Sequence, residues 1–79
     1  MLEYFLVDEN DAVLTYRYHP EGEKDYGFVY VNKTTGDYDV TKLADADTLH
    51  RWYVGHMFSR IRRFLKEGKF EKEGIVAWY

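Results

Sequence analysis

Four short runs of β-favouring residues come before one long stretch with helical periodicity, and a fifth short run follows it. Val, Tyr, Phe and Thr dominate the short runs, and turns rich in Asp, Asn and Gly separate them. The runs cover residues 2–7, 12–18, 26–31 and 38–43 before the helical stretch and residues 75–79 after it. Short polar turns join antiparallel neighbours. The order therefore predicts an α+β fold: an antiparallel β-sheet made of a four-strand meander and a C-terminal fifth strand, with a long helix packed on one face.

The turns and the strand patterns carry further expectations. Leu14, Tyr16 and Tyr18 alternate along the second run and are predicted to share one face of the sheet. Gly36 is predicted to take the left-handed conformation that closes the turn between the third and fourth runs. The polar alternate positions of the fourth run indicate an edge strand or a solvated face. The fifth run is expected to pair within the sheet.

The helical stretch is expected to begin at residues 44–47 and to end at about Lys66. Asp45 or Asp47 is predicted to cap its first turn, because a carboxylate there accepts hydrogen bonds from free backbone N–H groups. Gly68 supplies the stop. Apolar residues at helical spacing predict a buried stripe. Its members are Leu49, Tyr53, Met57, Ile61 and Phe64, flanked by Val54, Phe58 and Leu65.

One helix covers only one face of such a sheet. The second face is expected to carry tyrosines such as Tyr4, Tyr16, Tyr30 or Tyr38, depending on the register. Aromatic side chains on an open sheet face indicate a protein partner or a second copy of the chain.

A chain of 79 residues is expected to form a single domain, residues 1–79, with a small core. It contains no Cys, so disulfides and Cys-based zinc sites are excluded. The first apolar run lacks a basic flank and stops at Asp8, unlike a signal peptide. No stretch approaches the roughly 20 apolar residues of a membrane span. These features predict a cytoplasmic protein without a membrane partner.

The residue types that carry chemistry do not form a recognisable motif, so no catalytic residue, metal site or cofactor is predicted. His50 and His56 are six positions apart, a spacing that does not place two metal ligands on one helix face. His50 is expected to be buried and hydrogen-bonded, and His56 to pack beside Trp52. A small enzyme working from the His19 loop or from His56 and Ser59 ranks last among the hypotheses, because a third orienting group is missing.

A stripe of aromatic and basic residues along the helix margin is the best candidate for a partner-binding surface. Trp52, His56 and Arg60 follow four-residue spacing and share a helix face, and Ser59 and Arg63 lie beside them. Trp and Arg are the residues that most often anchor interfaces. In the alternative interpretation, Trp52 packs against the sheet edge and the arginines pair with acidic residues.

Charge is distributed unevenly within a net charge of −3. Residues 1–46 contain ten acidic and four basic residues, whereas residues 47–67 contain five basic and two acidic ones. A basic helix in an acidic protein can steer a nucleic acid. Nucleic-acid binding through the helix 47–67 is therefore the alternative function. Its basic residues are Arg51, Arg60, Arg62, Arg63 and Lys66.

Several segments resemble a set of short uncharacterised bacterial proteins. The matching segments are 32–36 (NKTTG), 42–44 (KLA), 58–62 (FSRIR) and 73–79 (EGIVAWY). The resemblance implies a free-standing cytosolic bacterial protein and brings no activity, cofactor or catalytic residue with it. The leading hypothesis is a small non-catalytic binding or assembly module that associates with a protein partner or with itself as a homodimer.

Overall fold

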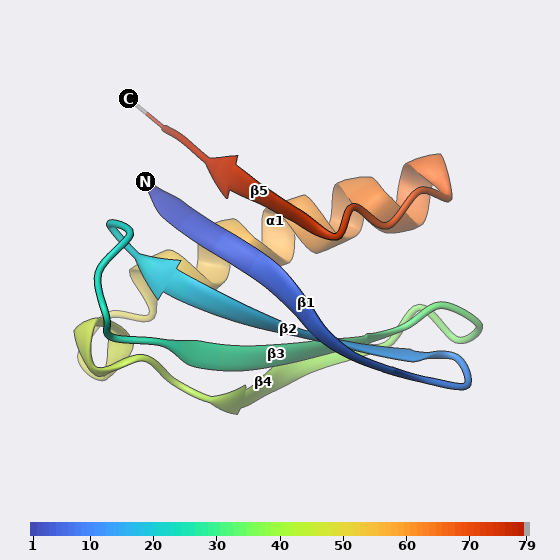
Figure 1. The fold of residues 1–79 in the computed structure, drawn as a ribbon, viewed down its shortest axis with the longest axis horizontal. Coiled ribbons are helices and arrows are strands. Elements are labelled where there is room, and N and C mark those ends of the chain that lie inside the picture. Colours follow the sequence, from blue (N-terminus) through green and yellow to red (C-terminus); the bar gives the residue numbers. More distant parts are fainter. Residues whose placement is uncertain (79) are drawn as a thin grey trace.

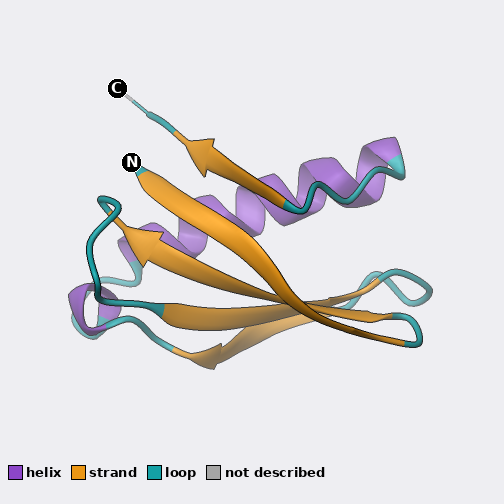
Figure 2. Ribbon diagram, in the orientation of Figure 1, coloured by secondary structure: helices purple, strands orange, loops and turns teal. Residues whose placement is uncertain are grey.

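The computed structural model describes residues 1–78 and confirms the α+β fold with an antiparallel sheet and one long helix. The elements are β1 (Leu2–Asn10), β2 (Val13–Pro20), β3 (Gly27–Asn32), β4 (Tyr38–Lys42), the 3₁₀ helix η1 (Asp45–Asp47), α1 (Trp52–Glu67) and β5 (Glu73–Val76). The strand order is β4-β3-β2-β1-β5, and every neighbouring pair is antiparallel. In Figure 1 the helix α1 runs behind the sheet. Figure 2 shows that the loops that connect the strands lie at the two ends of the sheet.

The two edges of the sheet are β4 and β5, so the prediction of an edge position for the fourth strand is confirmed. The fifth strand pairs with β1, from Leu2 opposite Val76 to Phe5 opposite Glu73. It therefore begins earlier and ends earlier than the predicted run 75–79. Tyr79, the last residue of that run, lies outside the described residues.

The core fills the space between α1 and the sheet face that it covers. The predicted alternation of Leu14, Tyr16 and Tyr18 is confirmed, because all three side chains are buried on this face. Further buried side chains from the sheet are Leu2, Tyr4, Val29, Val31 and Val76, and those from the helix are Val54, Met57, Ile61 and Phe64. The rings of Tyr4 and Tyr16 both pack against Phe64 at centroid distances of 5.8 Å. Large aromatic rings thus supply much of the apolar surface that this short chain buries.

The expectation that tyrosines populate the open sheet face is wrong for three of the four named residues. Tyr4 and Tyr16 are fully buried under the helix. Tyr38 is half-buried on the same side, with its ring 5.2 Å from that of Phe58. The register explains the difference, since Tyr4 lies opposite Tyr18 in the same set of inward positions. Tyr30 alone of the four lies opposite Thr15 and Asp39, on the uncovered face.

The helix begins later than predicted. Asp45–Asp47 form a 3₁₀ turn, and Arg51 takes a left-handed conformation (φ 52°, ψ 33°) immediately before Trp52. The helical periodicity therefore does not extend back to Leu49 and His50. Leu49 is 86% exposed and His50 is also exposed, so their predicted burial is wrong. The stop at Gly68 (φ 69°) and the left-handed turn at Gly36 (φ 81°) are confirmed.

Within the described residues, no helix combines the length and the apolar character needed to cross a membrane.

Candidate functional site

The face of the sheet opposite α1 carries a continuous row of alternating charged and aromatic side chains. The row consists of residues that lie directly opposite one another on adjacent strands, and we call it the cross-strand row. Its members, from β5 through β1, β2 and β3 to β4, are Glu73, Phe5, Arg17, Phe28 and Lys42. Side chains at directly opposite positions on one sheet face are in contact range of each other. The row thus spans the full width of the sheet.

Cations lie over aromatic rings within and beside this row. The Arg17 guanidinium carbon is 5.6 Å from the centroid of the Phe5 ring. The Lys42 ammonium is 4.3 Å from the centroid of the Tyr26 ring and donates a 2.8 Å hydrogen bond to the Tyr26 carbonyl. Tyr26 in turn meets Phe28 edge-on at 5.4 Å. These cation–π and aromatic contacts hold the cationic groups on the sheet surface.

His19 connects the aromatic residues to Arg17. Its Nε2 accepts a 2.9 Å hydrogen bond from Arg17 Nε, and its Nδ1 lies 2.9 Å from the Glu23 carbonyl oxygen. An accepting Nε2 requires the proton on Nδ1, which then donates to Glu23. Both contacts therefore specify one neutral tautomer. The ring lies between Phe5, at 5.8 Å, and Tyr26, at 6.0 Å.

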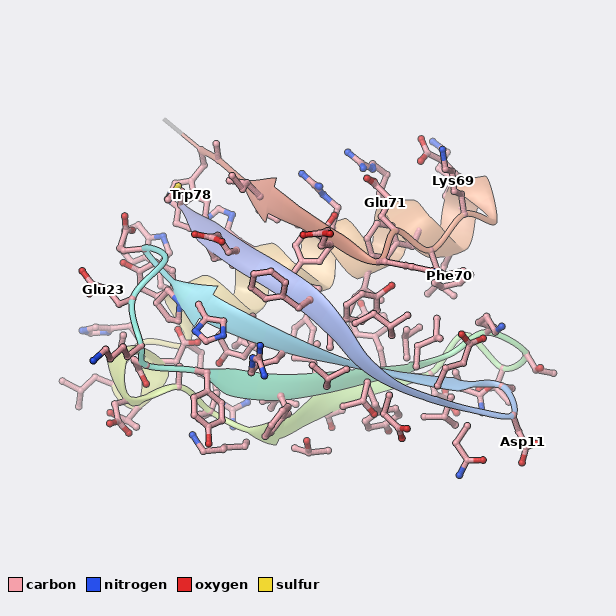
Figure 3. The ribbon with its side chains drawn as sticks, in the orientation of Figure 1. Asp11, Glu23, Lys69, Phe70, Glu71 and Trp78 are labelled. Carbon is pink, nitrogen blue, oxygen red and sulfur yellow. The ribbon has the colours of Figure 1, made fainter. Side chains whose placement is uncertain are left out.

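Two shallow hollows flank His19 on this face. The larger, of about 390 Å³, is lined by Arg17, His19, Lys24, Tyr26 and Phe28. The smaller, of about 280 Å³, is lined by Glu3, Phe5, His19, Gly22, Glu23 and Lys24. Figure 3 shows Glu23 in the loop at one end of the sheet, with Asp11 in the hairpin turn at the other. The larger hollow thus combines cations with rings, whereas the smaller one contains two carboxylates.

The predicted partner-binding stripe on the helix is divided in the structure. Trp52 is 61% exposed at the start of α1. The ring of His56, which the sequence predicts to pack beside Trp52, stacks flat on Trp78 at 3.8 Å with an interplanar angle of 7°. Ser59 Oγ accepts a 2.9 Å hydrogen bond from Arg62. Arg60 is half-buried and reaches under β1 and β5.

The arginines of the basic helix mostly contact other parts of the chain. Arg60 donates to the Tyr4 hydroxyl at 3.1 Å and to the Ile75 carbonyl at 3.4 Å. Arg62 donates to the Tyr38 hydroxyl at 3.0 Å. Arg63 pairs with Glu71 at 2.5 Å and with Glu67 at 3.6 Å. Arg51 and Lys66 are exposed near the two ends of α1.

Burial governs the ionisation of the core tyrosines. It raises the pKa of Tyr16 and Tyr18 far above the ordinary value of 10. It also raises the pKa of Tyr4, although the hydrogen bond from Arg60 works in the opposite direction. These hydroxyl groups therefore stay protonated at neutral pH. Tyr16 donates to the Glu71 carbonyl at 2.7 Å and Tyr18 to the Asp47 carboxylate at 2.6 Å, whereas the Tyr4 hydroxyl accepts from Arg60.

A second polar cluster ties the first residue of the chain to the helix. The Met1 ammonium contacts Glu21 at 3.0 Å, and the Tyr53 hydroxyl donates to the same carboxylate oxygen at 2.9 Å. These two hydrogen bonds lower the pKa of Glu21, and the bond to Glu21 raises the pKa of Tyr53. The cluster links the first residue of the chain to α1 through Glu21, in the loop that follows β2.

Across residues 1–78, the structure does not bring together three or more His, Asp or Glu side chains in a group able to hold a metal ion. The lining of the two hollows supplies rings, cations and carboxylates, but it includes no Ser or Thr hydroxyl. The open face is therefore suited to binding by stacking, ion pairing and apolar contact.

The cross-strand row was not identified from the sequence, although a signal for it was present. Placing Tyr16 and Tyr18 on one face puts Arg17 and His19 on the other by the same alternation. The partners of Arg17 on neighbouring strands depend on the register, which the strand patterns do not specify.

Comparisons with models of protein families, with curated proteins and with solved structures give no match to this chain. The resemblance to short bacterial proteins stays a prediction from the sequence.

Proposed function

We propose that this chain is a small non-catalytic binding module that acts through the open face of its sheet. The observation that carries this proposal is the cross-strand row, in which Arg17 lies between Phe5 and Phe28 on an uncovered surface. Aromatic residues and Arg are the side chains that most often anchor interfaces. Tyr26 is exposed and Phe5, Phe28 and Tyr30 are half-buried, and a group of partly exposed rings on one face is typical of an interaction surface.

The engagement of the helix arginines also favours the sheet face over the helix. A side chain that must bind a partner loses its internal contacts when it does so. Arg60 and Arg62 would each lose a hydrogen bond to a tyrosine hydroxyl. On the sheet face, Arg17 and Lys42 also make hydrogen bonds, but their partners, His19 and Tyr26, lie on the same face, so a molecule that covers the face does not have to break these bonds. A cytoplasmic location is part of this proposal, and the absence of Cys from the chain supports it.

A photo-crosslinking amino acid at two positions tests which surface binds. Position Tyr30 lies on the open face, and position Trp52 lies on the helix stripe. We expect discrete crosslinked products from the variant at Tyr30 and none from the variant at Trp52, after irradiation of cells that express each one. Products from the variant at Trp52 alone would instead identify the helix stripe as the binding surface. Circular dichroism of each purified variant controls for folding.

Nucleic-acid binding is the second candidate, and the larger hollow is the observation that favours it. Its lining joins the cations Arg17 and Lys24 to the rings of Tyr26 and Phe28, a combination that suits stacked bases and phosphates. The exposed helix residues Arg51 and Lys66 offer a second basic surface.

Fluorescence polarisation with labelled single-stranded and double-stranded oligonucleotides at low salt tests this candidate. Binding that weakens steeply as salt is added would support it. The Lys24→Ala variant and the Lys66→Ala variant then distinguish the hollow from the helix. The lack of any signal at low salt would end the candidate.

A further inference from the structure

The cross-strand row has opposite charges at its two ends. Glu73 stands on the edge strand β5 and Lys42 on the other edge strand, β4. Arg17 lies on β2, the central strand, and Phe5 and Phe28 lie on the strands to either side of it. A two-fold axis that runs along β2 exchanges the two ends of such a row. It places Lys42 opposite Glu73 of a second copy and Phe5 opposite Phe28 of that copy.

We propose that the partner of the open sheet face is a second copy of this chain, seated face to face about a two-fold axis parallel to the strands. The proposal rests on the proposed function, because it names the partner of the same surface. In a two-fold dimer the same patch serves both subunits, so the patch must be complementary to itself. The cross-strand row meets this condition, because the two-fold axis places Lys42 opposite Glu73 and Phe5 opposite Phe28.

Glu3 strengthens this polarity on the acidic side of the face. The half formed by β1 and β5 presents Glu3 and Glu73, and the hollow beside it contains the carboxylate of Glu3. The other half presents Lys42, and its hollow is lined by the cations Arg17 and Lys24, the second of which also lines the hollow beside Glu3. The two-fold axis therefore sets the cationic hollow of each copy against the acidic strands of the other. Such complementarity selects one orientation of the two sheets.

Two residues introduce unfavourable charge into this dimer, so the favourable contacts must outweigh the repulsion that these residues cause. Arg17 lies on the axis and meets its own copy, although planar guanidinium groups can stack. Asp39 on β4 adds a negative charge to the basic half, next to Tyr30. Its carboxylate accepts a 2.7 Å hydrogen bond from the backbone N–H of Val40.

Size and stability also fit a second copy. The molecule measures 30 × 24 × 19 Å, so a broad face is comparable with the ~800 Å² that each partner of a stable complex buries. A domain of 79 residues has a small core, and association is a common way for such domains to gain stability.

Charge reversal at the two ends of the row gives a sharp test. Sedimentation velocity over a concentration series measures the dissociation constant of the 9.5 kDa chain. We expect the wild type to dimerise, and Lys42→Glu or Glu73→Lys alone to weaken the dimer about tenfold or more, since each puts like charges opposite one another.

The double variant should restore the affinity, because the reversed charges again face each other. An equimolar mixture of the two single variants should associate more tightly than either alone, for the same reason. Lys66→Glu, on the helix side, is the matched control and should leave the constant unchanged.

Three outcomes would overturn the second copy as the partner. They are a wild-type monomer at every concentration, a dimer that does not respond to the reversals, and weakened single variants that the double variant fails to restore. A monomer that still gives crosslinks to another protein from position Tyr30 would overturn this inference and leave the proposed function standing. The absence of every product at Tyr30, a self-crosslink included, would remove the proposed function as well.

Discussion

The hydroxyl group of Tyr18 donates a 2.6 Å hydrogen bond to a carboxylate oxygen of Asp47, and both side chains are fully buried. Asp47 also accepts hydrogen bonds from the backbone N–H groups of Tyr53, at 2.7 Å, and Val54, at 3.0 Å. The Tyr18 oxygen accepts from the Ala44 N–H at 3.0 Å. One carboxylate therefore caps the first turn of α1 and fastens it to the central strand of the sheet.

Replacing Asp47 should unfold the start of α1. The Asp47→Ala variant leaves the Tyr18 hydroxyl and two helix N–H groups without acceptors in a buried site. We expect a loss of about 3 kcal/mol in the free energy of unfolding, measured by urea titration with circular dichroism. Asp45→Ala is the matched control, because the Asp45 side chain is exposed, and it should change the value by less than about 0.5 kcal/mol. Equal losses in the two variants would contradict the role assigned to Asp47.

Alkaline pH should destabilise the fold through the core tyrosines. The folded chain holds the pKa of Tyr16 and Tyr18 far above 10, whereas the unfolded chain ionises them near 10. Their contribution to stability is therefore complete below pH 10 and falls as the pH rises further, because protons then leave only the unfolded state. Urea titrations between pH 8 and pH 12 should show this decline.

Tyrosinate absorbance at 295 nm checks the same mechanism independently. Tyr16 and Tyr18 should ionise only together with unfolding, because burial in the folded chain holds their pKa far above the ordinary value of 10. A smooth titration of all tyrosines without loss of structure would contradict it.

The sequence predicted the elements better than their contacts. The alternation of Leu14, Tyr16 and Tyr18 placed β2 correctly, because period-two patterns depend only on local geometry. Asp47 was named as a cap, yet the helix starts five residues later, at Trp52. The reason is that Arg51 takes a left-handed conformation between Asp47 and the helix, and the Asp47 carboxylate caps the helix from before this residue. Residue propensities do not reveal such an interruption.

Predicting the candidate site requires the register between strands, whereas predicting the strands themselves does not. Arg17 and Phe28 become neighbours only when β2 and β3 pair in the observed alignment. The bulge between Leu6 and Asp8 shifts the register of β1 on β2 by one residue. Such an extra residue changes which face later side chains reach, and the sequence gives no direct sign of it.

Arg60 should prove structural. Its guanidinium group links α1 to β1 and β5 through the Tyr4 hydroxyl and the Ile75 carbonyl, and it lies 5.6 Å from the centroid of the Tyr4 ring. We expect Arg60→Ala to lower the free energy of unfolding by about 1–2 kcal/mol. Arg51→Ala, at an exposed position before the helix, is the comparison and should be within about 0.5 kcal/mol of the wild type. A stable Arg60→Ala protein would return Arg60 to the list of residues free to bind a partner.

Two glycines give opposite predictions for the same substitution. A Cβ atom at Gly27 would fall within contact distance of the Tyr18 ring and 2.5 Å from the Lys42 carbonyl oxygen, which belongs to the neighbouring strand. Backbone cannot yield as a flexible side chain does, so Gly27→Ala should destabilise the fold by about 1–3 kcal/mol.

A Cβ atom at Gly55, on the exposed side of α1, meets no atom within 4 Å. Gly55→Ala should therefore stabilise the helix by about 0.5–1 kcal/mol, since alanine restricts the unfolded chain and favours helix. Thermal unfolding of both variants beside the wild type measures the two shifts, and a loss of stability in Gly55→Ala would indicate that another molecule or segment packs closely at that point of the helix.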